Sequence, residues 1–243
     1  MKKPAMILFD YGHTLVYEHS FDAVKGTQAV MKYAVRNDNN LDAEEINRFS
    51  NEIFETIGSR ARDYGVEVHN HMFQKLLYES LNIEFSLSHE DIELVFWDHA
   101  APGEPMPHIE KVLEALRQKG IRSGVISNIS FGGNSLARRI NRLIPENDFE
   151  FILASSEYVF RKPDPLLFRL ALKKAGLSPE EVWYCGDNTR FDVIGSSSVG
   201  IFPVWYHSEK DCFYRDLSLD QKPDCDCLYI RDWQELVRIV ENM

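Results

Sequence analysis

The stretch MILFDYGHTL, residues 6–15, joins a short apolar run to a polar turn. The run Met6–Phe9 carries no charge and is followed at once by Asp10, so it predicts a buried strand with a carboxylate at its carboxyl end. Gly12 and His13 belong to the turn that leaves this strand. The nature of the fold then depends on whether similar strands follow along the chain.

Four further apolar runs are separated by helical patterns; they are RSGVIS (122–127), FILA (151–154), EVWYCG (181–186) and GIFPVWY (200–206). The segment 109–120 places apolar residues at helical spacing and ends at Gly120, and the segment 164–176 repeats this design with Gly176. Strands that alternate with helices predict an α/β fold, a Rossmann-like parallel sheet with helices on both faces. A polar loop at 207–227 and a closing helix near 232–242 complete the expected core.

The first strand and the helix at 109 are separated by almost a hundred residues without strand-like alternation. Helical patterns occupy 41–58, 71–81 and 88–97, and Asp42 and Glu45 have the spacing of a capping box. We therefore predict an α-helical cap inserted after the first strand, over the carboxyl edge of the sheet. The expected domains are a Rossmann-like catalytic core at 1–15 and 103–243 and a helical cap at 16–102.

Composition excludes several classes of partner. The formal net charge of −11, without a basic stripe, disfavours nucleic acid as a ligand. No apolar run approaches the roughly 20 residues of a membrane span, and the N-terminal apolar stretch is too short for a signal peptide. Four cysteines without regular spacing indicate reduced thiols. We expect a cytoplasmic protein without a membrane or nucleic-acid partner, and we favour a monomer.

Polar side chains follow each of the first four expected strands. These residues, in chain order, are Asp10, Ser127, Asn128, Lys162, Asp187 and Asp192. Each residue taken singly could be a helix cap or a loop residue. Because ligands of open parallel sheets bind at the carboxyl ends of the strands, the ordered series predicts a site that combines carboxylates, a hydroxyl and an amine.

The segments ILFDYGHTL, VISN, RKPDPLLF and YCGDNTRFDVIGSSSVG resemble the four motifs of the haloacid dehalogenase-like hydrolase superfamily, in order and at similar spacing. The resemblance covers about residues 4–15 and 103–206, while the inserted helices resemble the family's cap in position only. It implies a Mg²⁺-dependent phosphatase that acts on a small phosphorylated metabolite.

The resemblance implies a role for each residue of the site. Asp10 would attack phosphorus and form an aspartyl-phosphate. Mg²⁺ would be held by the Asp10 carboxylate, the Gly12 carbonyl and Asp187, with Asp192 supporting them from behind. For phosphate binding, Lys162 would neutralise charge, and the Ser127 hydroxyl and the Asn128 backbone N–H would hold a phosphoryl oxygen.

The chain departs from the family pattern at Gly12, where the family carries a second Asp that protonates the leaving group and activates water. Loss of a general acid–base group costs on the order of 10²–10⁴ in rate. The imidazole of His13 could substitute for this acid. The alternative is that His13 only replaces a small residue in the turn.

Other functions remain open at this stage. The dehalogenase branch also lacks the second Asp, but it is disfavoured because Asp187 and Asp192 are both present. Phosphonate cleavage would need a Schiff-base lysine in the cap, for which Lys75 is the candidate. The main alternative is a catalytically weakened phosphate-binding or regulatory protein with the same fold, and Gly12 is the feature that favours it. A nicotinamide-binding fold is disfavoured because the first strand ends in an aspartate instead of a glycine-rich turn.

Overall fold

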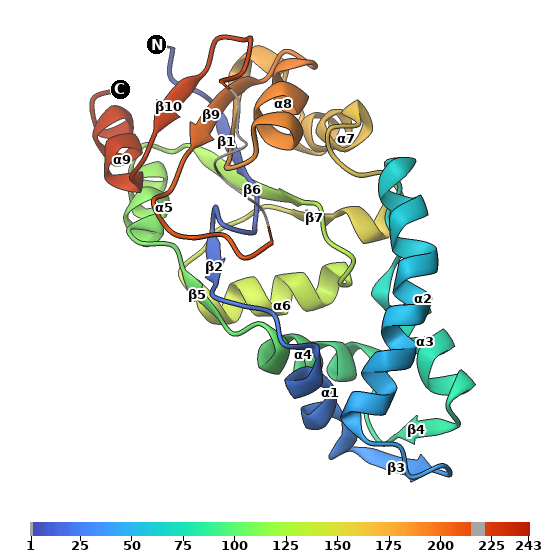
Figure 1. The fold of residues 1–243 in the computed structure, drawn as a ribbon. Helices are drawn as coiled ribbons and strands as arrows, with labels where there is room; N and C mark the ends of the chain where they lie inside the picture. Colours follow the sequence, from blue (N-terminus) through green and yellow to red (C-terminus); the bar gives the residue numbers. More distant parts are fainter. Residues whose placement is uncertain (1, 215–221) are drawn as a thin grey trace.

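The computed structural model describes residues 2–214 and 222–243 and contains a six-stranded sheet (Figure 1). All neighbouring strands are parallel, in the order β10-β9-β8-β1-β6-β7. The strands are β1 (Met6–Phe9), β6 (Arg122–Ser127), β7 (Ile152–Ala154), β8 (Val182–Gly186), β9 (Phe202–Tyr206) and β10 (Leu228–Ile230). The five predicted strands are confirmed, and β10 adds an edge strand that the sequence did not predict.

Helices cover both faces of this sheet, as predicted. Ile7 and Phe9 of β1 pack toward α5 (Ile109–Gln118), α6 (Gly133–Leu143) and α9 (Trp233–Glu241). Met6 and Leu8 point to the opposite face, where α7 (Pro165–Ala175) completes the second core. The strand β1 is therefore buried on both faces, which explains its uninterrupted apolar sequence. Shorter helical segments complete the core: η1 (Ser155–Glu157), η2 (Pro179–Glu181), η3 (Thr189–Ile194) and α8 (Gly195–Ser197).

The register of the central strands brings their carboxyl ends to one level. Phe9, the last residue of β1, pairs with Val125 on one side and with Cys185 on the other. Asp10 therefore leaves the sheet beside the ends of β6 and β8. The chain continues from those two ends into Asn128 and Asp187, so the side chains predicted to share a site emerge at the same edge.

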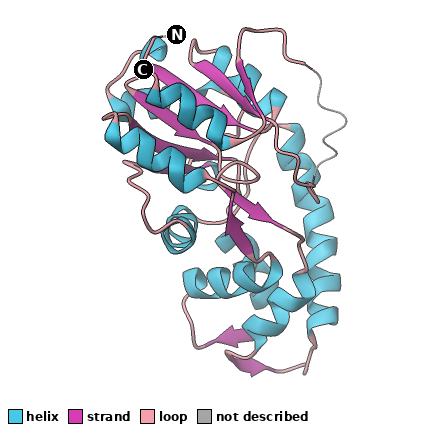
Figure 2. Cartoon of the chain, turned by 90° about the vertical axis from the view of Figure 1, so that its left-hand side faces the viewer, coloured by secondary structure: helices cyan, strands magenta, loops and turns pink. Residues whose placement is uncertain are grey.

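A helical insert, residues 23–100, lies to one side of the sheet (Figures 1 and 2). Its helices are α1 (Ala23–Met31), α2 (Ala43–Asp63), α3 (Asn70–Ser80) and α4 (His89–Ala100). It has a hydrophobic core of its own, which includes Val30, Ile46 and Leu77. The predicted capping box is present at the start of α2, where the Asp42 and Glu45 side chains each accept the other's backbone N–H.

Two antiparallel pairs of strands in and beside the insert were not predicted. The strand β3 (Ala34–Asn37) pairs with β4 (Ile83–Phe85) inside the insert. The two segments that connect the insert to the sheet also pair, as β2 (Val16–Glu18) and β5 (Gly103–Pro105). Each of these strands is too short to show alternation in the sequence. The proposed domain limits at 15/16 and 102/103 stay predictions, and the structure places paired strands beside both of them. No helix in the described parts of the chain is both long and apolar enough to cross a membrane.

One buried arginine ties this connection together. Arg139 of α6 is 1% exposed, and its guanidinium donates to the Tyr11 hydroxyl at 2.8 Å and to Glu18 Oε1 at 3.0 Å. The same group donates to Asp98 of α4 and to the Ala101 carbonyl. Arg139 therefore joins the sheet, the strand β2 and the end of the insert through one planar cation.

We expect Arg139→Met to lower the free energy of unfolding by about 3–5 kcal/mol, because it leaves Glu18 without its buried cation. Urea unfolding measures this change. Arg142→Met is the matched control, since Arg142 lies on the same helix and binds the same Asp98 but its side chain is 54% exposed. We expect at most about 1 kcal/mol for the control. Equal losses in the two variants would contradict a special role for Arg139.

Candidate active site

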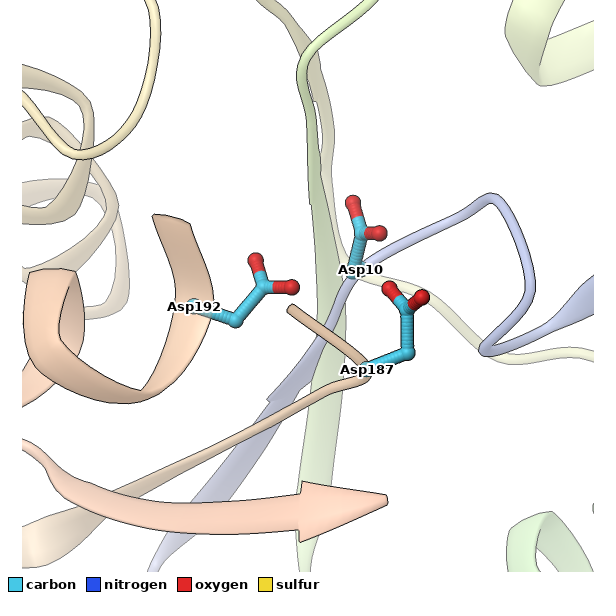
Figure 3. Close-up of side chains that lie close together, drawn as sticks. All are labelled: Asp10, Asp187 and Asp192. Carbon is cyan, nitrogen blue, oxygen red and sulfur yellow. The ribbon is translucent and has the colours of Figure 1, made fainter. Parts of the chain in front are cut away.

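Three carboxylates meet at the carboxyl edge of the sheet (Figure 3). Asp10 follows β1, Asp187 follows β8, and Asp192 lies in the π-helical segment η3. Each of them offers an oxygen within 4.8 Å of the others, and in Figure 3 the three carboxyl groups converge. Carboxylate oxygens at this spacing are the donors that a hard divalent cation such as Mg²⁺ prefers.

The amine of Lys162 is the counter-charge to this cluster. Lys162 is 2% exposed, and its Nζ donates to Asp10 Oδ1 at 2.7 Å and to Asp192 Oδ1 at 2.6 Å. The Tyr184 hydroxyl, at 2.7 Å, and the Ile126 carbonyl, at 3.1 Å, complete its surroundings. One lysine against three carboxylates leaves an excess of negative charge in this cluster, so a divalent cation fits the residues that are present.

The surroundings of Asp10 and Lys162 raise the pKa of both side chains. Burial raises the pKa of the Asp10 carboxyl to about 6, with a further rise from Asp192, although Lys162 lowers it. Burial opposes the charge of Lys162, but Asp10 and Asp192 outweigh it and raise the pKa of the amine. Near neutral pH, therefore, a carboxylate and an ammonium face each other in the cluster.

Asn128 fixes the position of Lys162 through the backbone. The Asn128 side chain accepts the Lys162 backbone N–H at 2.7 Å and donates to the Lys162 carbonyl at 2.9 Å. The side chain is thus engaged inside the protein, and the ligand-binding role expected for Asn128 rests on its backbone N–H. Ser127, which is 2% exposed, precedes it at the end of β6.

Asp192 differs from the other two carboxylates. Its Oδ1 accepts from Lys162, and its Oδ2 accepts the backbone N–H of Asn188 at 2.9 Å. Because protein donors engage both oxygens, Asp192 is suited to support a metal site from behind. Asp10, Asp187 and the Gly12 carbonyl are the groups that could hold a metal directly.

A cavity of about 450 Å³ brings most of the predicted residues together. The predicted residues that line it are Asp10, Gly12, Ser127, Asn128, Lys162, Asp187 and Asp192. His13 is not among its lining residues. His13 lies in the turn with a positive φ of 57° and 3% exposure, and its ring packs 5.9 Å from that of Tyr17. This geometry favours the reading of His13 as a turn residue.

The structure also places Tyr214 and Arg161 in the wall of this cavity. A Cβ atom built on Gly12 would lie 3.2 Å from the Tyr214 hydroxyl, and the φ of Gly12 lies outside the left-handed region. Glycine at position 12 therefore leaves room for the Tyr214 hydroxyl, and it is not required there by an unusual backbone angle. Tyr214 belongs to the predicted polar loop at 207–227. It lies far from Gly12 in the sequence, so no sequence pattern predicted this contact.

Lys75, the candidate for Schiff-base chemistry, lies elsewhere. Its side chain is 63% exposed and pairs with Glu79 of the same helix at 3.9 Å. It lines neither this cavity nor the adjoining cavity beneath the insert. The described geometry therefore gives no support to phosphonate cleavage through Lys75.

Comparison with known proteins agrees with this fold. The family model for haloacid dehalogenase-like hydrolases matches residues 7–205. The chain belongs to this family and is a hydrolase of it.

Two relatives illustrate the range of similarity. The glyceraldehyde 3-phosphate phosphatase of Methanocaldococcus jannaschii is 27% identical over 240 residues, which cover 98% of this chain and 97% of that protein. The enzyme of the same name from Pyrococcus furiosus is 30% identical over 139 residues, 56% of this chain. This second match spans 55% of the Pyrococcus protein, about half of its length.

Two crystal structures resemble the whole chain. A HAD phosphatase from Thermococcus onnurineus has a TM-score of 0.61 and 20% identity, with 98% of each chain covered. A 2-haloacid dehalogenase from Pseudomonas syringae has a TM-score of 0.62 and 18% identity, with 100% of this chain and 99% of that chain covered. At these identities the likeness concerns the fold alone, so the chemistry must be argued from the residues of the site.

The charge balance of the cluster predicts a pH-dependent loss of stability in Lys162→Met. Without the amine, the folded-state pKa of Asp10 rises further, because no cation faces its carboxylate. A raised carboxyl pKa destabilises the fold as the pH rises through it. We expect a deficit of about 3–5 kcal/mol near pH 8 that shrinks toward about pH 5.

Urea unfolding in EDTA at the two pH values measures this difference. Lys173→Met is the control, because Lys173 is an exposed residue of α7. A deficit in Lys162→Met that stays constant between the two pH values would contradict the assigned charge balance.

Proposed function

We propose that the protein is a Mg²⁺-dependent phosphatase that hydrolyses small phosphorylated metabolites through an aspartyl-phosphate on Asp10. The observation that carries this proposal is the placement of the Asp10 carboxylate against the buried Lys162 amine and beside Asp187, at the sheet edge where ligands bind. The phosphatase names of the two relatives support the same reaction class.

In the proposed reaction, Asp10 attacks phosphorus, and the bond between phosphorus and the ester oxygen breaks. The leaving oxygen departs with the electron pair of that bond. Water then attacks the aspartyl-phosphate, so that phosphate is released and the Asp10 carboxylate is restored. Bound Mg²⁺, held by Asp10, the Gly12 carbonyl and Asp187, would supply the positive charge that lets an anionic carboxylate approach an anionic phosphate.

The remaining residues supply positioning and charge. Lys162 neutralises the Asp10 carboxylate and a phosphoryl oxygen, and its backbone is held by the Asn128 side chain. The Ser127 hydroxyl and the Asn128 backbone N–H bind a second phosphoryl oxygen. Asp192 orients Lys162 and the loop at Asn188. We further propose that residues 16–102 act as the cap that selects the substrate.

The alternative proposal is a phosphate-binding or regulatory protein that turns over poorly, and Gly12 is the observation that favours it. The dehalogenase alternative is weaker, because the acidic cluster suits a cation better than a halide. We also propose a cytoplasmic location, which is supported by the irregular spacing of the four cysteines. The monomeric state stays a prediction.

The decisive test is phosphate release from a panel of acyl phosphates, aryl phosphates and alkyl phosphates, with Mg²⁺ and with EDTA. We expect turnover only with Mg²⁺, and we expect Asp10→Asn to abolish it while the circular dichroism spectrum stays unchanged. The panel must include glyceraldehyde 3-phosphate. Absence of release from every substrate, together with tight binding of phosphate, would favour the binding protein instead. Halide release from 2-haloacids in EDTA would revive the dehalogenase branch.

The glycine at position 12 predicts a dependence on the leaving group. Acyl and aryl phosphates, whose leaving groups depart without protonation, should be hydrolysed faster than alkyl phosphates. Gly12→Asp should raise the rate on alkyl phosphates most, by up to about 10²–10⁴. Because the new side chain would start 3.2 Å from the Tyr214 hydroxyl, the gain should be larger in the double variant with Tyr214→Ala.

His13→Ala is the control for this prediction. We expect it to leave the ratio of aryl to alkyl turnover unchanged, since His13 does not line the cavity that holds Asp10. A selective collapse of alkyl phosphate turnover in His13→Ala would identify His13 as the acid and overturn the assignment of a missing proton donor.

A further inference from the structure

A second cavity, of about 560 Å³, opens between the helical insert and the sheet edge. It shares five lining residues with the cavity that holds Asp10: Glu18, Asn128, Ile129, Arg161 and Tyr214. The two cavities therefore adjoin each other. A molecule with its phosphoryl group beside Asp10 can extend the rest of its structure beneath the insert.

Seven of the twenty residues that line this second cavity are aromatic, and they lie beside polar residues such as Ser50 and Asn51. Phe21 and Phe96 lie 6.0 Å apart between ring centroids, and Phe54 and Phe73 meet edge to face at 6.3 Å. Trp97 of α4 stacks on Phe131, which lies in the loop between β6 and α6, with 4.1 Å between the ring centroids. This pair therefore joins the insert to the core. The cavity thus has aromatic residues on the insert side and on the sheet side.

Part of this aromatic surface faces water. Phe21 is 48% exposed and Phe54 is 50% exposed, although both line the cavity. Burying apolar surface yields roughly 25 cal/mol for each Å² removed from water. An apolar ligand group that covers these rings would therefore bind more tightly, whereas a hydrated chain of hydroxyl groups would leave the rings exposed to water.

The charged groups at the border of the cavity already bind one another. Arg161 donates to Glu67 Oε1 at 2.9 Å, and Glu67 Oε2 accepts from the Ser155 hydroxyl at 2.7 Å. Glu18 accepts from Trp97 and from Arg139, each at 3.0 Å. Arg161 and Glu18 at the border are therefore each paired with a side chain of opposite charge. Among the described residues here, no excess cation is left to bind a second anionic group of a ligand. These contacts favour a ligand whose remote part is neutral.

We propose that this cavity binds a neutral aromatic or bulky aliphatic group, esterified to the phosphate that Asp10 attacks. The inference rests on the proposed function and names its substrate class. The volume of the cavity lies within the roughly 300–1,000 Å³ that is typical of small-molecule pockets. The walls of such pockets are mostly apolar with a few polar groups. The reaction would convert the phosphate monoester and water into phosphate and the corresponding phenol or alcohol.

This substrate class differs from the compound in the relatives' names. Glyceraldehyde 3-phosphate carries a short, hydrated three-carbon chain, which has no large apolar face for the rings to cover. The chain should therefore prefer a bulky apolar ester over glyceraldehyde 3-phosphate, even though the phosphoryl end of both substrates would be bound in the same way.

Phenyl phosphate and 2-naphthyl phosphate form a matched pair for the test, because their phenolate leaving groups have similar basicity. We expect kcat/KM to be at least about tenfold higher for 2-naphthyl phosphate, owing to the second ring. Phe54→Ala should bring the ratio close to one, and Phe54→Leu should retain most of it. Met72→Ala is the control, since Met72 is an apolar residue of α3, 73% exposed and outside the lining of the cavity.

A binding measurement makes the test independent of turnover. Calorimetric titration of Asp10→Asn with both esters should give a dissociation constant at least about tenfold lower for 2-naphthyl phosphate, and this difference should disappear when Phe54→Ala is added. Equal affinities in the Asp10→Asn background would overturn the inference.

The pattern of failure separates the two proposals. If acetyl phosphate is hydrolysed but the naphthyl and phenyl esters are treated alike, the phosphatase proposal stands and the apolar site is wrong. If no phosphate compound is hydrolysed but naphthyl phosphate still binds more tightly through Phe54, the site stands and the phosphatase proposal fails.

Discussion

The contact between the Lys162 amine and the carboxylates of Asp10 and Asp192 is the constraint around which the sheet edge is built. A buried cation and buried carboxylates are tolerated only when each is matched in charge and hydrogen bonding. The level register of β1 and β6 places Asp10 and the backbone carbonyl of Ile126 at one edge, and η3, which follows β8, contributes Asp192. Asn128 binds the Lys162 backbone N–H and carbonyl, which fixes the point from which the lysine side chain extends into the cluster.

The same edge also shows what the site lacks and what surrounds the missing group. Gly12 provides a carbonyl but no acid, and the hydroxyl of Tyr214 approaches the space where a side chain would begin. In the proposed reaction, the electrostatic groups would therefore act without the usual proton donor. A leaving group of low basicity would suit such a site, and the aromatic cavity beneath the insert offers room for a leaving group of that kind.

Much of the sheet could be predicted because its determinants are local in the sequence. Apolar runs such as Met6–Phe9 are buried on both faces, and the helical stripe of Ile109, Val112 and Leu113 is buried as expected. The convergence of Asp10, Lys162 and Asp187 followed from topology alone, since parallel strands end at one edge. Their catalytic roles are proposals that await the experiments described above.

The features that the sequence did not reveal depend on contacts between distant segments. The strands β2 and β5 have three residues each and pair across the whole insert, so neither has a pattern of its own. Tyr214, which follows β9, lies near Gly12 in the wall of the cavity although the two residues are far apart in the sequence. The aromatic cavity likewise contains rings from separate helices. In the sequence alone, each of these aromatic residues resembles an ordinary core residue.

The pairing of β2 with β5 has a mechanical consequence. Two separate linkers would let the insert swing about many axes, whereas two hydrogen-bonded strands form a ribbon that resists stretching and shear and bends chiefly out of its own plane. Arg139 anchors this ribbon to α6 through Glu18. Any displacement of the insert relative to the sheet would therefore be limited by this ribbon as well as by the direct contacts between the insert and the core, such as the stacking of Trp97 on Phe131.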